Sequence, residues 1–179
     1  MKPILVPIAA ALLAAGCAQM GLGSPGGGAA AKATAQLAPT TGSNTRGTVS
    51  FTQVGDKVRV VAQISGLKPN AEHGFHVHEK GDCSSGDGMS AGGHYNPTGK
   101  PHGDHRSGGE RHAGDLPNLR ADGYGNASAT FDTTGITVGG GSADIIGKGL
   151  IVHRDPDDYK SQPAGNAGPR IACAVIQKG

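Results

Sequence analysis

Apolar and polar residues alternate along several short runs of the chain. The runs 48–54 and 57–64 both alternate, and only Gly55-Asp56 separates them. Because successive side chains of a strand face opposite sides, this period of two predicts β-strands, and the two-residue Gly-Asp link predicts a hairpin. No window of the sequence has a convincing helical period. Further strands are expected at residues 74–79, 125–131, 143–153 and 170–176.

Two long stretches interrupt this pattern. Residues 81–119 and residues 154–169 have little strand character. Loops of that length inside a compact domain are uncommon and are usually functional. The sequence therefore predicts an all-β fold, an antiparallel sandwich or barrel with two long loops.

The N-terminal residues have the pattern of a secretion signal. Lys2 precedes an apolar stretch, residues 4–15, that is too short to span a bilayer. Residues 1–16 are therefore expected to be a signal peptide. Cys17 follows a sequence similar to a bacterial lipobox, which predicts a lipid on Cys17, a membrane anchor and a periplasmic location. An ordinary cleaved signal with an incidental cysteine is the alternative.

The next segment, residues 17–46, is rich in Gly, Ala, Pro and Thr and has no hydrophobic period. It is expected to be a flexible tether. The folded domain is then expected at residues 47–179. Two cysteines, Cys83 and Cys173, lie in this domain. In an exported chain they most simply form one disulfide, with two free buried thiols as the alternative.

Composition and charge narrow the function classes. The 179 residues include 32 Gly, 11 Pro and no Trp, and the formal net charge is +2. Frequent glycine and proline favour short strands and turns over helices. A nearly balanced charge gives no reason to expect nucleic-acid binding.

Histidines gather in the region that the strand pattern leaves irregular. His76 and His78 are two apart on an expected strand, so both point to one face while Phe75 and Val77 point to the other, apolar face. Imidazole is the commonest protein ligand for zinc and copper. The candidate ligands are too many for one tetrahedral ion, which leaves two metals, or one metal and several idle histidines. They are His76, His78, His94, His102, His112, Asp115 and His153.

Four segments of this region resemble the copper/zinc superoxide dismutase family, in the order in which the family has them. The resemblance extends over essentially residues 47–179. It implies a Greek-key β-sandwich or flattened barrel of about eight antiparallel strands. It also implies an enzyme that dismutates superoxide to dioxygen and hydrogen peroxide by cycling Cu(II) and Cu(I). The segments are residues 74–78, 91–97, 111–116 and 165–173.

The resemblance assigns a role to each candidate residue. Arg170 would guide the anion to copper, Asp157 would link a copper histidine to a zinc histidine, and Cys83 and Cys173 would form the family's disulfide. His94 would bridge both metals. Copper would bind His76, His78, His94 and His153, and zinc would bind His94, His102, His112 and Asp115.

Two histidines, His102 and His105, are candidates for the same zinc ligand position. His102 keeps the family's spacing from His94 and its following glycine, so it is expected in preference to His105. His73 is expected to be a hydrogen-bonded neighbour of the site and not a ligand.

Three kinds of function compete. The first is an exported, lipid-anchored superoxide dismutase that serves antioxidant defence outside the cytoplasm. The second is a non-catalytic copper chaperone or metal buffer of the same fold, and the third is a structural domain whose metals only stabilise it. The full set of copper ligands together with Arg170 favours the enzyme. A homodimer is compatible with the sequence, which does not determine the oligomeric state.

Overall fold

The computed structural model of the chain describes Met1, residues 30–106 and residues 108–179. The expected signal peptide beyond Met1, the expected lipid on Cys17 and the tether up to residue 29 lie outside the described residues. In the described part, no helix is long and apolar enough to cross a membrane.

Eight strands form one curled antiparallel sheet, in agreement with the all-β prediction. Their order is β5-β8-β9-β1-β2-β3-β7, and β10 pairs with β1. A small second sheet pairs β4 (Glu72–His73) with β6 (Leu119–Arg120). The strands of the main sheet are β1 (Lys32–Pro39), β2 (Arg46–Val54), β3 (Lys57–Ser65), β5 (Phe75–His78), β7 (Ala127–Thr133), β8 (Gly149–His153), β9 (Arg170–Val175) and β10 (Gln177–Lys178).

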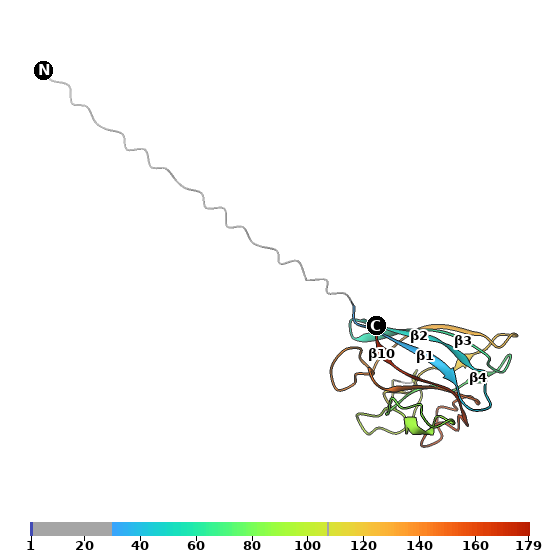
Figure 1. Ribbon diagram of the computed structural model, residues 1–179. Coiled ribbons are helices and arrows are strands. Elements are labelled where there is room, and N and C mark those ends of the chain that lie inside the picture. Colours follow the sequence, from blue (N-terminus) through green and yellow to red (C-terminus); the bar gives the residue numbers. More distant parts are fainter. Residues whose placement is uncertain (2–29, 107) are drawn as a thin grey trace.

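The connections cross the sheet in the Greek-key manner. The chain passes from β3 to β5 at the far edge, returns to β7 beside β3, and then crosses again to β8 beside β5. β1 pairs with β2 along residues 32–37 and with β9 only at Ala38 and Pro39, so it joins the two halves of the curled sheet. Figure 1 shows β1, β2 and β3 in one layer, with the green segment that carries the short 3-10 helix η1 (Met89–Ala91) at the opposite side of the molecule.

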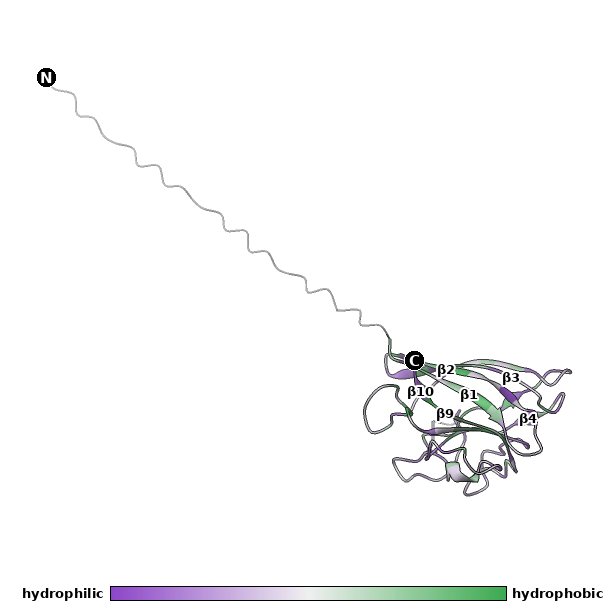
Figure 2. Cartoon of the chain, in the orientation of Figure 1, coloured by the Kyte–Doolittle hydropathy of each residue, from purple (hydrophilic) through white to green (hydrophobic). Residues whose placement is uncertain are grey.

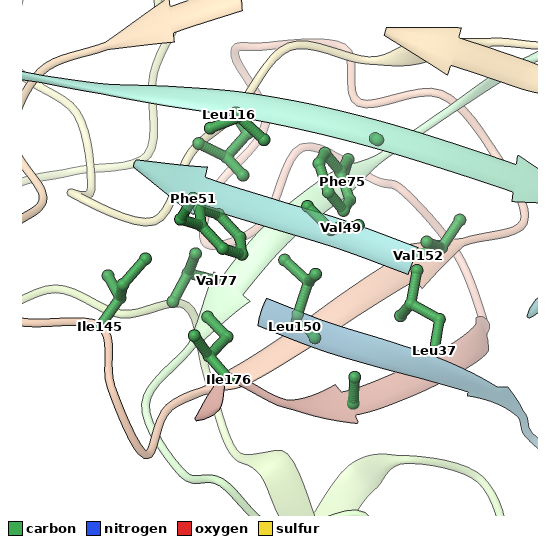
Figure 3. Packing of buried hydrophobic residues seen from close by; sticks show 14 of the residues in the cluster. Leu37, Val49, Phe51, Phe75, Val77, Leu116, Ile145, Leu150, Val152 and Ile176 are labelled. Atoms are coloured by element: carbon green, nitrogen blue, oxygen red, sulfur yellow. The ribbon is translucent and has the colours of Figure 1, made fainter. Parts of the chain in front are cut away.

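Buried apolar side chains, which alternate with more exposed ones along the strands, fill the interior between the layers. In β3 the buried side chains are Val58, Val60, Ala62 and Ile64, and the residues between them are exposed or half-buried. Figure 2 shows apolar and hydrophilic segments succeeding one another along the strands. Each large apolar side chain that is fully buried contributes about 1.5–3 kcal/mol. Phe51, Phe75, Leu116, Leu150 and Ile176 meet in this core, as Figure 3 shows.

The hairpin between β2 and β3 is as predicted. Val54 pairs with Lys57, which leaves Gly55-Asp56 as the two-residue link. Gly55 has a φ of 60°. That left-handed conformation strains most L-residues and is readily adopted by glycine, which explains why glycine stands there.

The expected start of the folded domain at residue 47 is wrong. β1 begins at Lys32, and the strand after it begins at Arg46. Ala33, Ala35 and Leu37 are buried between more polar neighbours, so this segment does alternate. Alanine is so weakly apolar that the alternation of residues 32–39 cannot be distinguished, in the sequence alone, from the alanine-rich segment that precedes it.

The strand expected at residues 143–153 is shorter than predicted. It begins only at Gly149, although Ile145 is buried in the core. The Asp144 side chain accepts hydrogen bonds from the backbone N–H groups of Gly139 (3.1 Å) and Ile146 (3.0 Å). Such side-chain bonds compete with a strand ladder and here produce a turn.

Candidate metal centre

Four buried histidines converge at one side of the sheet. One ring nitrogen of each lies within 4.8 Å of those of the others, and the four are His76, His78, His94 and His153. We call them the copper set, after the metal that the family resemblance assigns to them. His76 and His78 leave β5 on the face opposite Phe75 and Val77, which are buried in the core, as the strand period predicted. The irregular segment is held against β5 by an isolated bridge between His78 and His94.

The copper set presents four buried ring nitrogens that have no hydrogen-bond partner. They are Nδ1 of His76 and Nε2 of His78, His94 and His153. The other nitrogen is occupied in each ring: Nδ1–H of His78 donates to Gly92 O (3.0 Å), and Nδ1–H of His153 donates to Gly168 O (3.1 Å). Leaving a buried polar atom unpaired costs about 1–3 kcal/mol. Four such atoms facing one another therefore fit a metal ion.

A second set of ligands adjoins the first. His94, His102, His112 and Asp115 place one ligand atom each within 4.8 Å of one another. We call them the zinc set, after the metal that the family resemblance assigns to them. Nδ1 of His94 lies 2.8 Å from Asp115 Oδ1 and 3.3 Å from His112 Nδ1. Nδ1 of His102 lies 3.0 Å from Asp115 Oδ2. Three imidazole nitrogens and one carboxylate match the donor preference of zinc.

Burial favours the neutral form of three histidines in the copper set, because it lowers their pKa values. It lowers the pKa of His94 to about 4 and that of His153 to about 3, because a charged imidazolium loses its hydration there. It also holds the pKa of His78 well below its ordinary value. Neutral imidazole is the form that binds metals.

The acid in the zinc set stays ionised. Burial alone would raise the pKa of Asp115, but hydrogen bonds with His102, His112 and His94 outweigh it and hold that pKa well below its usual range. Burial alone would lower the pKa of His102, but Asp115 and Asp157 raise it to about 9. A cation at this set would take the place of the His102 proton.

Asp157 links the two sets, in the position that the resemblance implies. Its Oδ2 lies 2.9 Å from His76 Nε2, and its Oδ1 lies 2.9 Å from His102 Nε2. Asn118 holds this loop through two hydrogen bonds of 2.9 Å with the Asp157 backbone. The sequence reasoning missed Asn118, because nothing in its spacing marks it.

The structure brings His102, and not His105, into the zinc set. The His105 ring lies instead against Tyr159, with 5.4 Å between the centroids. His73 is buried, and its Nδ1–H donates to the backbone carbonyl of His153 (2.9 Å), so it supports the copper set without belonging to it.

Arg170 lies beside the copper set and lines a cavity next to it. Together with His153 it lines a cavity of about 270 Å³. Its guanidinium is half-buried and donates to Gly88 O (2.7 Å) and Gly92 O (2.6 Å). Gly92 O also accepts from His78, so one carbonyl fixes both the arginine and a copper-set histidine.

The disulfide joins Cys83 to Cys173, with 5.8 Å between the Cα atoms and a sequence separation of 90. It ties the histidine-bearing segment to β9, three residues after Arg170. The free-thiol alternative is thereby excluded.

A curled Greek-key sheet with two adjoining ligand sets and an arginine beside one of them defines a binuclear β-sandwich metalloprotein. Residues 45–176 match the family model described as "Copper/zinc superoxide dismutase (SODC)". The chain belongs to the copper/zinc superoxide dismutase family. It is an enzyme of that kind, with superoxide as substrate and copper and zinc as cofactors.

Individual relatives support the same family assignment. The chain is 42% identical over 150 residues to superoxide dismutase [Cu-Zn] 2 of Aquifex aeolicus, a match that covers 82% of this chain and 86% of the relative. It is 47% identical over 137 residues to superoxide dismutase [Cu-Zn] of Paramecium bursaria Chlorella virus 1, covering 73% and 72%.

Solved structures have the same fold. The crystal structure of a double mutant of a SOD-like protein from Bacillus subtilis superimposes with a TM-score of 0.70 at 34% identity, covering 80% of this chain and 96% of that one. The clock protein EA4 superimposes with a TM-score of 0.73 at 41% identity, covering 82% and 93%.

Proposed function

We propose that this chain dismutates superoxide to dioxygen and hydrogen peroxide at a two-metal centre bridged by His94. The observation that carries the proposal is the position of that ring. His94 belongs to both ligand sets, with Nδ1 beside Asp115 and with Nε2 buried and unpaired. An imidazole in this position can bind one ion through each nitrogen.

The donor atoms present fit both metals. His76, His78, His94 and His153 would hold copper through the four unpaired nitrogens, and His94, His102, His112 and Asp115 would hold zinc. When bound, copper supplies a one-electron redox couple, and zinc supplies fixed positive charge without redox chemistry.

The chain's own residues bind the substrate and manage the proton. Arg170 offers a permanent positive charge at the cavity that it shares with His153, where a small anion can be held. Nε2 of His94 is the atom that can hold a proton for the product, hydrogen peroxide. Nδ1 of His94 lies 2.8 Å from Asp115 Oδ1, and a zinc ion shared by these two atoms would keep the ring in place while Nε2 gains or loses that proton.

The test is superoxide decay in the copper- and zinc-loaded protein, with His153→Ala and Arg170→Ala as variants. We expect a loss of at least 100-fold for His153→Ala, because one of four copper donors is removed. For Arg170→Ala we expect a smaller loss, about 10-fold, and a weaker dependence on salt, because screening then acts on less charge. Arg170→Lys keeps the charge and should fall between wild type and Arg170→Ala.

A metal buffer is the second candidate. It would bind both ions tightly and leave superoxide decay at the uncatalysed rate, an outcome that would refute the catalytic proposal. The half-buried Arg170 at the cavity favours catalysis, since a storage site gains nothing from a cation beside its metal.

We further propose that the protein works outside the cytoplasm, on the periplasmic side of a bacterial membrane, anchored by a lipid on Cys17. The lipobox-like sequence before Cys17 supports this proposal. Mass spectrometry of the mature chain should find Cys17 as a lipidated first residue, and Cys17→Ser should move the protein from the membrane fraction to the soluble fraction. A mature N-terminus at any other residue would contradict the anchor.

A further inference from the structure

Gln162, in the loop between β8 and β9, holds the backbone of a zinc-set residue from another part of the chain. Its Oε1 accepts a hydrogen bond from His102 N–H (2.9 Å), and its Nε2 donates to His102 O (2.9 Å). The same Nε2 lies 3.3 Å from Lys160 O, which fixes the orientation of the amide. Engaging both backbone groups of one residue sets the direction of that residue as well as its position.

His102 has little other backbone support. It lies outside every strand and helix, and among the described residues both of its backbone hydrogen bonds go to Gln162. Its ring is held by Asp157, which belongs to the same loop as Gln162. One loop therefore holds both the backbone and the ring of this ligand.

Gln162 also reaches the other side of the site. It lines the cavity of about 270 Å³ together with His153 and Arg170. A single side chain thus bonds a zinc-set residue and forms part of the wall along which an anion approaches the copper set.

We infer that Gln162 is a positioning residue that couples zinc binding at His102 to the wall of the substrate cavity. The inference rests on the two-metal function proposed above. With the His102 ring held by zinc, the backbone groups that bind Gln162 are fixed, and part of the cavity wall is fixed with them. Coupling between two sites is reciprocal. Zinc and an anion in the cavity should therefore change each other's affinity by the same factor. Changing Gln162 should weaken zinc binding and reduce that factor.

The first measurement is zinc affinity, by competition with a chromogenic chelator, together with the visible spectrum of Co(II) in the zinc set. We expect Gln162→Ala to bind zinc about 10-fold more weakly and to shift the Co(II) bands, because partners of metal ligands typically contribute 10- to 100-fold. Gln162→Glu keeps the acceptor for His102 N–H but places a carboxylate oxygen against His102 O, so it should also bind zinc more weakly than wild type.

Ser161→Ala is the matched control. Ser161 neighbours Gln162, but among the described residues its hydroxyl bonds only to Asp158 and Asn166 within the loop. Its zinc affinity and Co(II) spectrum should equal those of wild type. If Ser161→Ala loses as much zinc affinity as Gln162→Ala, general loosening of the loop explains the effect and the inference is overturned.

The second measurement is azide affinity for the copper-loaded protein, with and without zinc. Zinc should change azide affinity several-fold in wild type and in Ser161→Ala, and clearly less in Gln162→Ala. An unchanged zinc effect in Gln162→Ala, or unchanged zinc affinity in that variant, would overturn the inference alone. Failure of the wild-type protein to bind zinc or Co(II) at this set would overturn the proposed two-metal function as well.

Discussion

At the scale of single residues, the site depends on positions where a side chain is absent. A Cβ atom on Gly165 would lie 1.8 Å from Asp157 Oδ1 and 2.7 Å from His102 Nε2. Gly165 also has a φ of 66°, a conformation that disfavours other residues. The contact that links the two ligand sets therefore requires glycine at this position.

Gly165→Ala should separate Asp157 from His102. We expect a loss of about 2–4 kcal/mol in the free energy of unfolding, since backbone strain and a buried clash add. Zinc affinity should also fall. Chemical denaturation and chelator competition measure the two effects.

Gly140→Ala serves as the control for that substitution. A Cβ on Gly140 would meet nothing within 4 Å, and the change should stay within about 0.5 kcal/mol. If both variants behave alike, space at Gly165 is not what positions Asp157.

At the scale of elements, β1 decides whether the sheet is complete. It pairs with β2 on one side and with β9 and β10 on the other. It also places Ala33, Ala35 and Leu37 in the core. Without it, both halves of the curled sheet would expose strand edges.

A chain truncated to begin at Arg46 should therefore lose the cooperative unfolding transition that a chain beginning at Ala30 retains. Circular dichroism during urea denaturation would show the difference. A normal transition in the shorter chain would show that β1 is dispensable for folding.

At the scale of the whole molecule, a disulfide holds the long segment between β5 and β6 to the sheet, and metal binding would act on the same segment. The Cys83–Cys173 disulfide spans 90 residues of sequence. Closing a loop of that size restricts the unfolded chain, which the chain-entropy model values at roughly 4–5 kcal/mol.

Replacing both cysteines by alanine should lower the free energy of unfolding of the metal-free protein by about 3–5 kcal/mol. Calorimetry or urea denaturation measures the loss. Wild-type protein under strong reductant should show the same decrease, whereas the double variant should not respond to reductant. A reductant response in the double variant would point to a different cause.

Metal removal acts on the same segment. The two sets bury seven ligand residues, and the ligand atoms within each set lie within 4.8 Å of one another. Ions that bind only the folded state stabilise it, by about 4 kcal/mol for each site at a thousandfold excess over Kd.

The chelated protein should therefore melt at a clearly lower temperature, and zinc and copper together should restore the wild-type value. Magnesium should not restore it, because Mg²⁺ prefers oxygen ligands in octahedral geometry. Equal melting temperatures with and without the transition metals would show that the ligand sets do not bind these ions in the folded protein.

Much of the fold and of the metal site could be predicted from residue periodicity and motif spacing, and the reasons are physical. A period of two gives strands because side chains alternate across the pleat, so β2, β3 and β5 were predictable, as was the common face of His76 and His78. The resemblance of four segments to the copper/zinc superoxide dismutase family predicted the ligand sets, the roles of Arg170 and Asp157, and the disulfide. β1 could not be predicted from the sequence, because its buried residues are mostly alanines.

What the sequence by itself determined was the set of local patterns and the kinds of donor atom. Only the tertiary structure decided which histidine of residues 102–105 joins the zinc set, which nitrogen of each ring stays unpaired, and how Gln162 and Asn118 support their neighbours. These outcomes depend on loops far apart in sequence meeting at one place. Loop conformation follows from packing against the rest of the molecule, and no local period encodes it.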